Sequence, residues 1–583
     1  MEQRNRPDRE QGADAGDHID HTGHRGHHDH RDHTAHGDHG DRGGTGAVGE
    51  PGGPSGTGTA DGTDGTDGID GIDGIDGTDG TGTAGEQVGS IGRKAGRGLR
   101  WSLLGNLGTK ATTFVMGLVL ARLLVPEDFG LYAIALAATT FVMHVNDVGI
   151  IAATVQWRGR VEEMAPTATV MAVAFSTGMY GIFWVVAPYF AELAGSVEAT
   201  PVVRLLTAII LIDGVTAVRA GSLMRGFGHD RLTKANIAGS LVNAGVAVTL
   251  AANGAGAYSF AVGQVAANTV TGALVFAWAG LPFQLGFDRE VAARLLRFGA
   301  PLALGLGIEA VLMNADYVIV GAVLGPVALG FYLLAFNVSS WVPSVIGTAL
   351  RYVTVPSFSR LAEQRPESLS LGVQRSVPLL VAFVLPVAVV TATLAPAIVA
   401  FLYGEKWAPA AGVLALLAVL MVVRMLTSLA FDILTSAGAT RSTVWMNLGW
   451  AVALVPALWA GTHWYGIRGA AIGHALAGVL VALPVAALAL SRAGVRLAPV
   501  LPALVRPSLG AVVAAAVTVA LADLTSSLMG GLTGGDTGGV TAGSALVRLC
   551  VAGGGGLLAY LLVAVPAARL RQLGARAIPA RAR

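Results

Sequence analysis

The sequence predicts an all-α polytopic membrane protein with about 14 transmembrane helices, arranged as two six-helix pseudo-symmetric lobes plus two extra C-terminal helices. Hydrophobic residues make up 53% and charged residues 13% of the 583 positions, with a mean hydropathy of +0.59. A soluble domain carries about 25% charged residues. From residue 101 onward, long apolar stretches alternate with short polar connectors, and the first twelve form two halves that match at an offset of 200 residues.

The internal repeat is visible in identical residues at equivalent positions of the two halves. The matching pairs are Arg97 with Arg297, Gly105 with Gly305, Pro126 with Pro326, Gly130 with Gly330, Tyr132 with Tyr332, Ala135 with Ala335, and Thr154 and Val155 with Thr354 and Val355. Six spans per repeat, an even number, give both halves the same orientation, related by an axis along the membrane normal. Such duplicated membrane halves are typical of transporters with a central cavity between two lobes.

Apolar stretches of about 20 residues define the expected membrane helices. They lie at 101–123, 130–154, 166–190, 202–223, 236–252, 257–280, 299–323, 329–353, 377–402, 411–434, 444–461, 467–490, 504–522 and 546–565. The expected organisation is a His/Gly/Asp-rich cytoplasmic tail (1–92), an N-terminal lobe (93–285), a C-terminal lobe (286–492), two additional transmembrane helices (493–568) and a basic cytoplasmic tail (569–583).

Arginine and lysine side chains predict the orientation of these spans. The connectors on one side contain nearly all of them, and both termini fall on that side, whereas the opposite connectors contain little more than Lys406 and Arg468. By the positive-inside rule, the basic side is the cytoplasm. Only four lysines accompany a large excess of arginine, alanine and glycine, which indicates a GC-rich bacterial genome. We therefore expect a multi-pass protein of the bacterial inner membrane with both termini cytoplasmic.

The N-terminal tail is too polar to pack a hydrophobic core. It contains nine histidines between His18 and His39, followed by Gly-Thr-Asp and Gly-Ile-Asp triplets at 61–81. The histidines could bind Zn²⁺ or Ni²⁺ weakly, but a solvated low-complexity extension is the interpretation we favour. The single cysteine, Cys550, excludes an intramolecular disulfide and a cysteine-based metal site, so no cofactor is expected.

Several motifs resemble those of a known transporter family. They are Ala121-Arg-Leu-Leu-Val-Pro-Glu-Asp-Phe-Gly, Val355-Pro-Ser-Phe-Ser-Arg-Leu, Gly404-Glu-Lys-Trp-Ala-Pro-Ala and Gly466-Ile-Arg-Gly-Ala-Ala-Ile-Gly. Residues 95–495 resemble the Wzx-type oligosaccharide flippases, polysaccharide biosynthesis proteins of the multidrug/oligosaccharidyl-lipid/polysaccharide exporter superfamily. The resemblance implies alternating-access translocation of a polyprenyl-diphosphate-linked oligosaccharide from the inner to the outer leaflet. Implied partners are membrane lipids, a polysaccharide polymerase and glycosyltransferases.

Ionisable side chains at membrane depth are the candidate functional residues, because each costs roughly 2.5–3.5 kcal/mol at a helix centre and usually faces a cavity or a partner. The cations and amide expected to bind the substrate diphosphate are Lys110, Asn106, Arg122, Arg219 and Arg424. The acidic residues expected to couple transport to H⁺ or Na⁺ are Glu309, Asp316, Asp147 and Asp432. In the superfamily the first and seventh helices line the cavity, which implies that Lys110 faces Glu309 or Asp316.

Structural roles compete with these functional ones. Arg122 lies at the outer end of the first span, where an arginine commonly caps a helix C-terminus or meets interfacial water. Asp213 with Arg219, and Arg424 with Asp432, could form buried pairs or line the cavity. His144 with Asp147 fits a polar contact between helices better than a proton relay.

An enzymatic role is not expected, because the sequence contains neither a phosphate-binding Gly-x-x-x-x-Gly-Lys-Ser/Thr loop nor a His-Glu-x-x-His or Gly-x-Ser-x-Gly motif. A membrane glycosyltransferase, polymerase or ligase would need a large catalytic loop, whereas 523–545 is mostly Gly, Thr, Ser and Leu. Basic residues spread over many connectors do not suggest a nucleic-acid partner. The remaining alternatives are an ion-coupled multidrug antiporter of the same superfamily and a flippase of the lipid II type.

Overall fold

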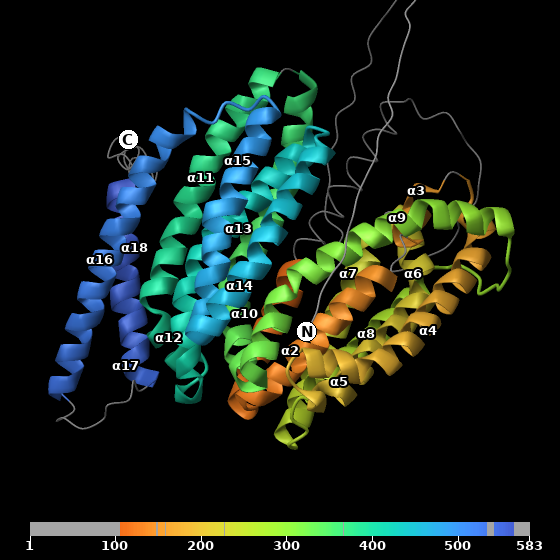
Figure 1. The fold of residues 1–583 in the computed structure, drawn as a ribbon, viewed down its shortest axis with the longest axis horizontal. Helices are drawn as coiled ribbons and strands as arrows, with labels where there is room; N and C mark the ends of the chain where they lie inside the picture. The colour runs from red at the N-terminus through yellow and green to blue at the C-terminus, as the bar shows by residue number, and fades with distance from the viewer. Residues whose placement is uncertain are drawn as a thin grey trace, which may run out of the picture. The chain divides into compact units, whose positions relative to one another are not determined.

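The computed structural model describes residues 105–564, apart from 147–149, 158, 227, 365 and 533–541, all within one unit of the chain, Thr81–Arg583. Both predicted tails and Asp147 lie outside the described residues. The helices of Figure 1 follow a first helical segment at 105–123 and are α2 (Pro126–Asn146), α3 (Ile150–Gln156), α4 (Val161–Leu193), α5 (Thr200–Thr207), α6 (Ile209–Arg225), α7 (His229–Ala252), α8 (Tyr258–Trp278), α9 (Arg289–Met313), α10 (Ala315–Gln364), α11 (Pro366–Thr393), α12 (Ala395–Leu402), α13 (Ala408–Ser436), α14 (Thr440–Ala477), α15 (Leu483–Arg492), α16 (Val500–Leu532), α17 (Ala542–Arg548) and α18 (Gly554–Ala564).

The predicted all-α class is confirmed, since every regular element of the described part is helical. Within it, eleven helices or helix pairs are long and apolar enough to cross a membrane, and the expected count of 14 is not confirmed. Neither the segment 105–123 nor α9 is among the eleven. The segment is less apolar because it carries Asn106, Thr109 and Lys110, which line cavities described below.

One of the eleven candidates, Arg441–Arg492, is a helical hairpin. Its 52 residues would extend about 78 Å as one helix, far more than the roughly 30 Å hydrocarbon layer. The helix breaks at Tyr465 and Gly466, where the glycine has φ 60°, a left-handed conformation that favours glycine. The two halves pack so closely that a Cβ at Gly461 would overlap the backbone of Gly469, and the reverse. This break lies between the spans expected at 444–461 and 467–490.

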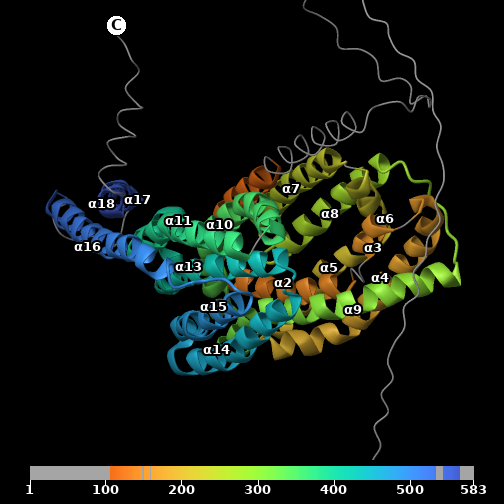
Figure 2. The same ribbon diagram turned by 90° about the horizontal axis from the view of Figure 1, so that it is seen from above.

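The two halves of the repeat meet where α2 packs on α10, as Figure 2 shows. A Cβ on Gly130 would overlap the carbonyl oxygen of Pro326, and a Cβ on Gly330 would overlap that of Pro126. These four residues belong to matching pairs of the sequence repeat, so each half presents the same surface to the other. The contact is therefore a pseudo-twofold interface between the predicted lobes.

Helices α9 and α16 complete the described fold through their contacts with other helices. Helix α9, which lies in the expected C-terminal lobe, packs on α2, α3 and α4, and its N-terminal part contacts α4. Val291 and Leu295 join Met164 in one apolar cluster, and the backbone N–H of Asp288 donates to Thr167 Oγ1 at 3.0 Å. At the other end of the sequence, α16 packs against α11 and α18, outside the repeated helices (Figure 1).

Candidate functional site

A cavity of about 420 Å³, the central cavity, lies between the two halves of the repeat. Its walls come from the segment 105–123, α2, α8 and α10, and Tyr403 also lines it. Lys110 is half-buried in this wall, opposite Asn337 and Ser340 of α10. The ion pairs among the described residues do not include Lys110. The ammonium group therefore faces the cavity without a carboxylate partner in the described part of the chain.

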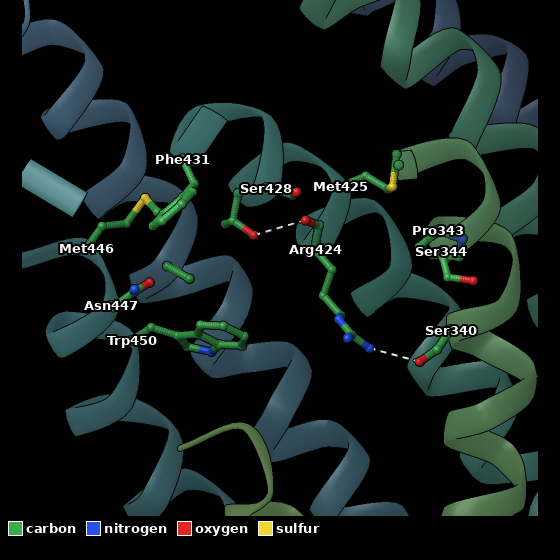
Figure 3. A pocket seen from close by; sticks show the side chains of 13 residues that line it. Ser340, Pro343, Ser344, Arg424, Met425, Ser428, Phe431, Met446, Asn447 and Trp450 are labelled. Carbon is green, nitrogen blue, oxygen red and sulfur yellow. Dashed lines mark hydrogen bonds between the residues drawn. The ribbon is translucent and has the colours of Figure 1, made fainter. Parts of the chain in front are cut away.

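A second cavity of about 310 Å³, the C-lobe cavity, lies among α10, α13 and α14. Figure 3 shows Arg424 of α13 extending across it toward α10, where one guanidinium N–H donates to Ser340 Oγ at 2.9 Å. The guanidinium also lies 4.9 Å from the centre of the Phe336 ring, a cation–π distance. Ser340 and Ser344 line both the C-lobe cavity and the central cavity. Lys110 and Arg424 thus line adjoining spaces.

The C-lobe cavity borders a buried polar network on α10 and α14. The Tyr332 hydroxyl donates to Asp316 Oδ2 at 3.2 Å and lies 3.3 Å from Nδ1 of His474. Asp316 Oδ1 accepts the backbone N–H of Tyr317 at 3.0 Å. All four residues are buried, and the Phe336 ring stacks on both Tyr332 and His474. Phe336 therefore contacts both Arg424 and this network, and the Arg424 guanidinium lies close enough to interact electrostatically with the Asp316 carboxylate.

Removing the Tyr332 hydroxyl should destabilise the protein. In Tyr332→Phe the buried Asp316 carboxylate keeps the Tyr317 N–H but loses its side-chain donor, and an unsatisfied buried group costs about 1–3 kcal/mol. The matched control is Tyr403→Phe, because the described residues offer the buried Tyr403 hydroxyl no hydrogen-bond partner. Thermal unfolding in detergent measures both, and equal melting temperatures for the two variants would contradict a stabilising role for the network.

Not all of the predicted acid–base pairs form. The structure does not bring Lys110 and Asp316 together as an ion pair, because the Asp316 carboxylate is bonded within the network. Arg424 is a cavity residue and makes no described ion pair with Asp432, which is buried on the same helix. The backbone of Glu309 lies in α9, but its side chain lies outside what the structure describes.

In the N-terminal half, Arg219 is buried and packs on aromatic rings rather than in a cavity. Its guanidinium lies 4.0 Å from the centre of the Phe276 ring and 5.4 Å from that of Phe283. Its Nε has no hydrogen-bond partner among the described atoms. Asp213 accepts a hydrogen bond of 3.3 Å from the Asn146 side chain. These groups do not line any of the three cavities described for this chain.

Arg122 caps a helix, which is one of the two roles that its position indicated. It donates through Nε to the Leu402 carbonyl at 3.1 Å and through Nη2 to the Phe401 carbonyl at 2.7 Å, at the C-terminus of α12. In the reverse direction, Lys406 caps the end of the segment 105–123 by donating to the carbonyls of Arg122 at 3.0 Å and Leu124 at 2.7 Å. Each half therefore caps a helix of the other, at the end of the molecule where α2 begins.

Trp407 completes this closed end. Its side chain is fully buried, its Nε1–H donates to the Ala121 carbonyl at 2.8 Å, and its ring packs edge-on against Phe129 and Phe331. The cost of an ionisable group at membrane depth does not point to Trp407, because a neutral aromatic residue carries no such cost. We name the contacts of Arg122, Lys406 and Trp407 across the two halves the latch.

Truncating the latch tryptophan should lower stability substantially. Trp407→Ala empties a fully buried site, and such truncations cost about 3–5 kcal/mol. Trp464→Ala is the matched control, since that side chain is 71% exposed. Thermal unfolding of both purified variants should show a large drop in melting temperature for Trp407→Ala alone. A similar drop for both would mean that tryptophan loss itself, rather than the latch, matters.

A third cavity, again of about 420 Å³, lies beside the central cavity between the segment 105–123, α7 and α8. We name it the amide cavity, because five amide side chains line it: Asn106, Asn236, Asn243, Gln264 and Asn268. Thr109 and Thr113 line both the amide cavity and the central cavity. The predicted site residue Asn106 therefore lies in this neighbouring space rather than in the same cavity as Lys110.

Known proteins are similar to this chain in sequence and in fold. The chain is 27% identical over 329 residues to the succinoglycan biosynthesis transport protein ExoT of Rhizobium meliloti (strain 1021), covering 55% of this chain and 65% of that protein. It therefore spans slightly less than two thirds of the length of that relative. It is 22% identical over 409 residues to the lipopolysaccharide biosynthesis protein WzxC of Escherichia coli (strain K12), covering 67% and 80%.

Among solved structures, the lipid II flippase MurJ in its inward closed conformation is similar with a TM-score of 0.65. The match covers 82% of this chain and 99% of that one at 11% sequence identity, so it shows a shared fold. A family model described as polysaccharide biosynthesis protein matches residues 119–412, which is just over half of the chain. The chain therefore belongs to the polysaccharide biosynthesis protein family of multi-pass membrane proteins.

Proposed function

We propose that this protein is a flippase that moves a polyprenyl-diphosphate-linked oligosaccharide from the inner to the outer leaflet of a bacterial inner membrane. The observation that carries the proposal is the pair of cations, Lys110 and Arg424, which line adjoining cavities and form no ion pair with a described carboxylate. Both side chain types bind phosphate groups, lysine as a point charge and arginine through paired N–H donors. Membership of the polysaccharide biosynthesis family supports the oligosaccharide part of the substrate.

The charge of the cavities favours a flippase over a multidrug antiporter. Among the side chains that the structure describes, no aspartate or glutamate lines the central, C-lobe or amide cavity, whereas Lys110 and Arg424 do. A pump for cationic drugs would place carboxylates in its cavity, because opposite charge concentrates the ligand in a low-dielectric space. The cavities of this chain are suited to an anionic headgroup.

The latch supports a loading direction. Arg122 and Lys406 close the end that the arginine and lysine distribution places on the outer face, with both termini cytoplasmic. We propose that the diphosphate enters from the cytoplasmic side while the lipid tail stays in the bilayer. Separation of the two halves at Gly130 and Gly330 then exposes the glycan outside. Binding of H⁺ or Na⁺ at Asp316 resets the cavity, and Phe336, which contacts both Arg424 and Tyr332, links the two events.

Deletion of the gene tests this proposal. The expected result is accumulation of a polyprenyl-linked oligosaccharide in the inner leaflet and loss of a surface polysaccharide, both restored by the intact gene. Drug sensitivity is scored in parallel. Unchanged glycolipid with raised drug sensitivity would replace the proposal with the antiporter, and accumulation of the cell-wall precursor lipid II would identify a lipid II flippase. Polymerase and glycosyltransferase partners would be sought by cross-linking in the same strains.

A further inference from the structure

The amide cavity is a polar space within the membrane-spanning part of the chain, and no charged side chain that the structure describes lines it. Its walls come from α7 and α8, both candidate membrane spans, and from the segment 105–123. Besides its five amides, the side chains of Thr109, Thr113, Thr233, Ser240 and Thr271 line it. Amides and hydroxyls are costly in an apolar environment unless bonded, and bonds between α7 and α8 use only some of these groups.

Part of the hydrogen-bonding capacity of these amides is unused. Asn243 Nδ2 donates to Gln264 Oε1 at 3.1 Å, and Asn268 Nδ2 donates to the Gln264 backbone carbonyl at 2.8 Å. These bonds leave Asn243 Oδ1, Asn268 Oδ1 and the side-chain N–H groups of Gln264 without partners among the described residues, and the Asn236 side chain has none either. The free atoms include acceptors and donors, so they must meet water or a ligand that can do both.

Sugar hydroxyl groups are such ligands, because each can donate one hydrogen bond and accept others. The described wall contains no charged residue, which argues against uronic acids or other charged sugars in this space, since a carboxylate would meet no cation among these residues. The location of the cavity also supports binding of sugars, because Thr109 and Thr113 line both this cavity and the central one. A ligand whose diphosphate lies at Lys110 therefore has a continuous route for its first sugars.

We infer that the amide cavity is a binding subsite for the uncharged sugars next to the diphosphate, and that it selects among lipid-linked glycans. The inference rests on the proposed function and adds the class of sugar. Amides that hydrogen-bond a substrate hydroxyl discriminate strongly against ligands that lack it, because the protein groups are then left unpaired. The diphosphate site gives affinity for every lipid of this class, and the amide cavity gives specificity for the glycan.

The test compares three probes with the full-length protein in proteoliposomes: sugar-free polyprenyl diphosphate, the same lipid carrying a neutral oligohexoside, and one carrying a uronic acid as its first sugar. The wild type should move the neutral glycolipid roughly 10-fold faster than the acidic one. Asn236→Ala with Asn268→Ala removes two amides that make no bond between helices, and should slow the neutral glycolipid about 10-fold. Movement of sugar-free polyprenyl diphosphate should be unchanged.

The matched control is Asn253→Ala, because Asn253 caps the end of α7 outside all three cavities. An equal loss for all three probes in the double variant, or no loss for any, would overturn the inference while leaving the flippase intact. Faster movement of the acidic glycolipid by the wild type would also overturn it. If the wild type moves none of the three lipids, the proposed function itself fails, a result distinct from the other outcomes.

Discussion

A chain carrying Lys110→Ala together with Arg424→Ala is expected to lose transport of a lipid-linked oligosaccharide while still inserting into the membrane. The two side chains line adjoining cavities, and neither forms an ion pair with a described carboxylate, so their charges are available to the substrate. Hydrogen bonds to charged groups contribute about 1.5–3 kcal/mol each, so losing both should slow transport roughly 100-fold or more. The initial rate in proteoliposomes measures the effect.

Charge-preserving and surface variants make this experiment specific. Lys110→Arg and Arg424→Lys keep a cation in each cavity and should retain most of the rate, with the greater loss at Arg424 because its planar group also stacks on Phe336. Lys234→Ala removes an exposed lysine that pairs with Asp230 at 3.6 Å and should transport normally. Normal transport by the double alanine variant, at normal yield and melting temperature, would contradict an anionic headgroup at this site.

The cost of a charge at membrane depth explains why the sequence pointed to Lys110 and Arg424. That cost depends only on position along a span, so it needs no knowledge of the fold. The cost does not say, however, in which direction the side chain points from the helix, as Arg122 shows. Arg122 lies three turns beyond Lys110 on the same helical segment, yet it caps α12 while Lys110 lines the central cavity. Only the packing of the two halves separates these roles.

The expected contact between Lys110 and Asp316 did not form for a local reason. The chain breaks at Asn314, so Asp316 lies in the first turn of α10, where backbone N–H groups are free to bind a carboxylate. No glycine or proline marks this break in the sequence. Neutral residues such as His474 and the asparagines of α7 also gave no signal, because their importance arises from neighbours on other helices.

The fold itself was more predictable than these contacts, because it follows from apolar length and from the repeat. The pairs Pro126 with Pro326 and Gly130 with Gly330 stood out in the sequence as equal positions of two halves. In the structure they contact one another across the pseudo-twofold interface. A glycine conserved between halves is therefore explained by geometry: at this point two backbones approach too closely for any side chain.

Adding a single methyl group at each of these glycines should open the closed end. In Gly130→Ala with Gly330→Ala, each new Cβ would overlap a carbonyl oxygen of the facing proline, so α2 and α10 must separate. Overpacking costs about 1–3 kcal/mol per site, which for two sites should lower the closed population roughly 30-fold or more. An alternating-access cycle that needs this closed state should then stop. A cysteine at Asn337, which lines the central cavity, reports the change through labelling by a membrane-impermeant maleimide from outside, with Cys550 replaced by serine.

Replacing a glycine with alanine elsewhere in a helix should raise stability, which is the opposite of the effect expected at Gly130 and Gly330. A control at other glycines therefore separates the overlap from the replacement itself. Alanine in a helix interior is more favourable than glycine by roughly 0.5–1 kcal/mol. The control Gly178→Ala with Gly181→Ala in α4, where no atom lies within 4 Å of the added Cβ and neither residue lines a described cavity, should therefore be neutral or stabilising. Labelling at position 337 should rise, and transport should fall, only when Gly130 and Gly330 are changed. Unchanged labelling in that variant would mean that the α2–α10 contact persists despite the overlap, and the closed end would then not be the gate of the transport cycle.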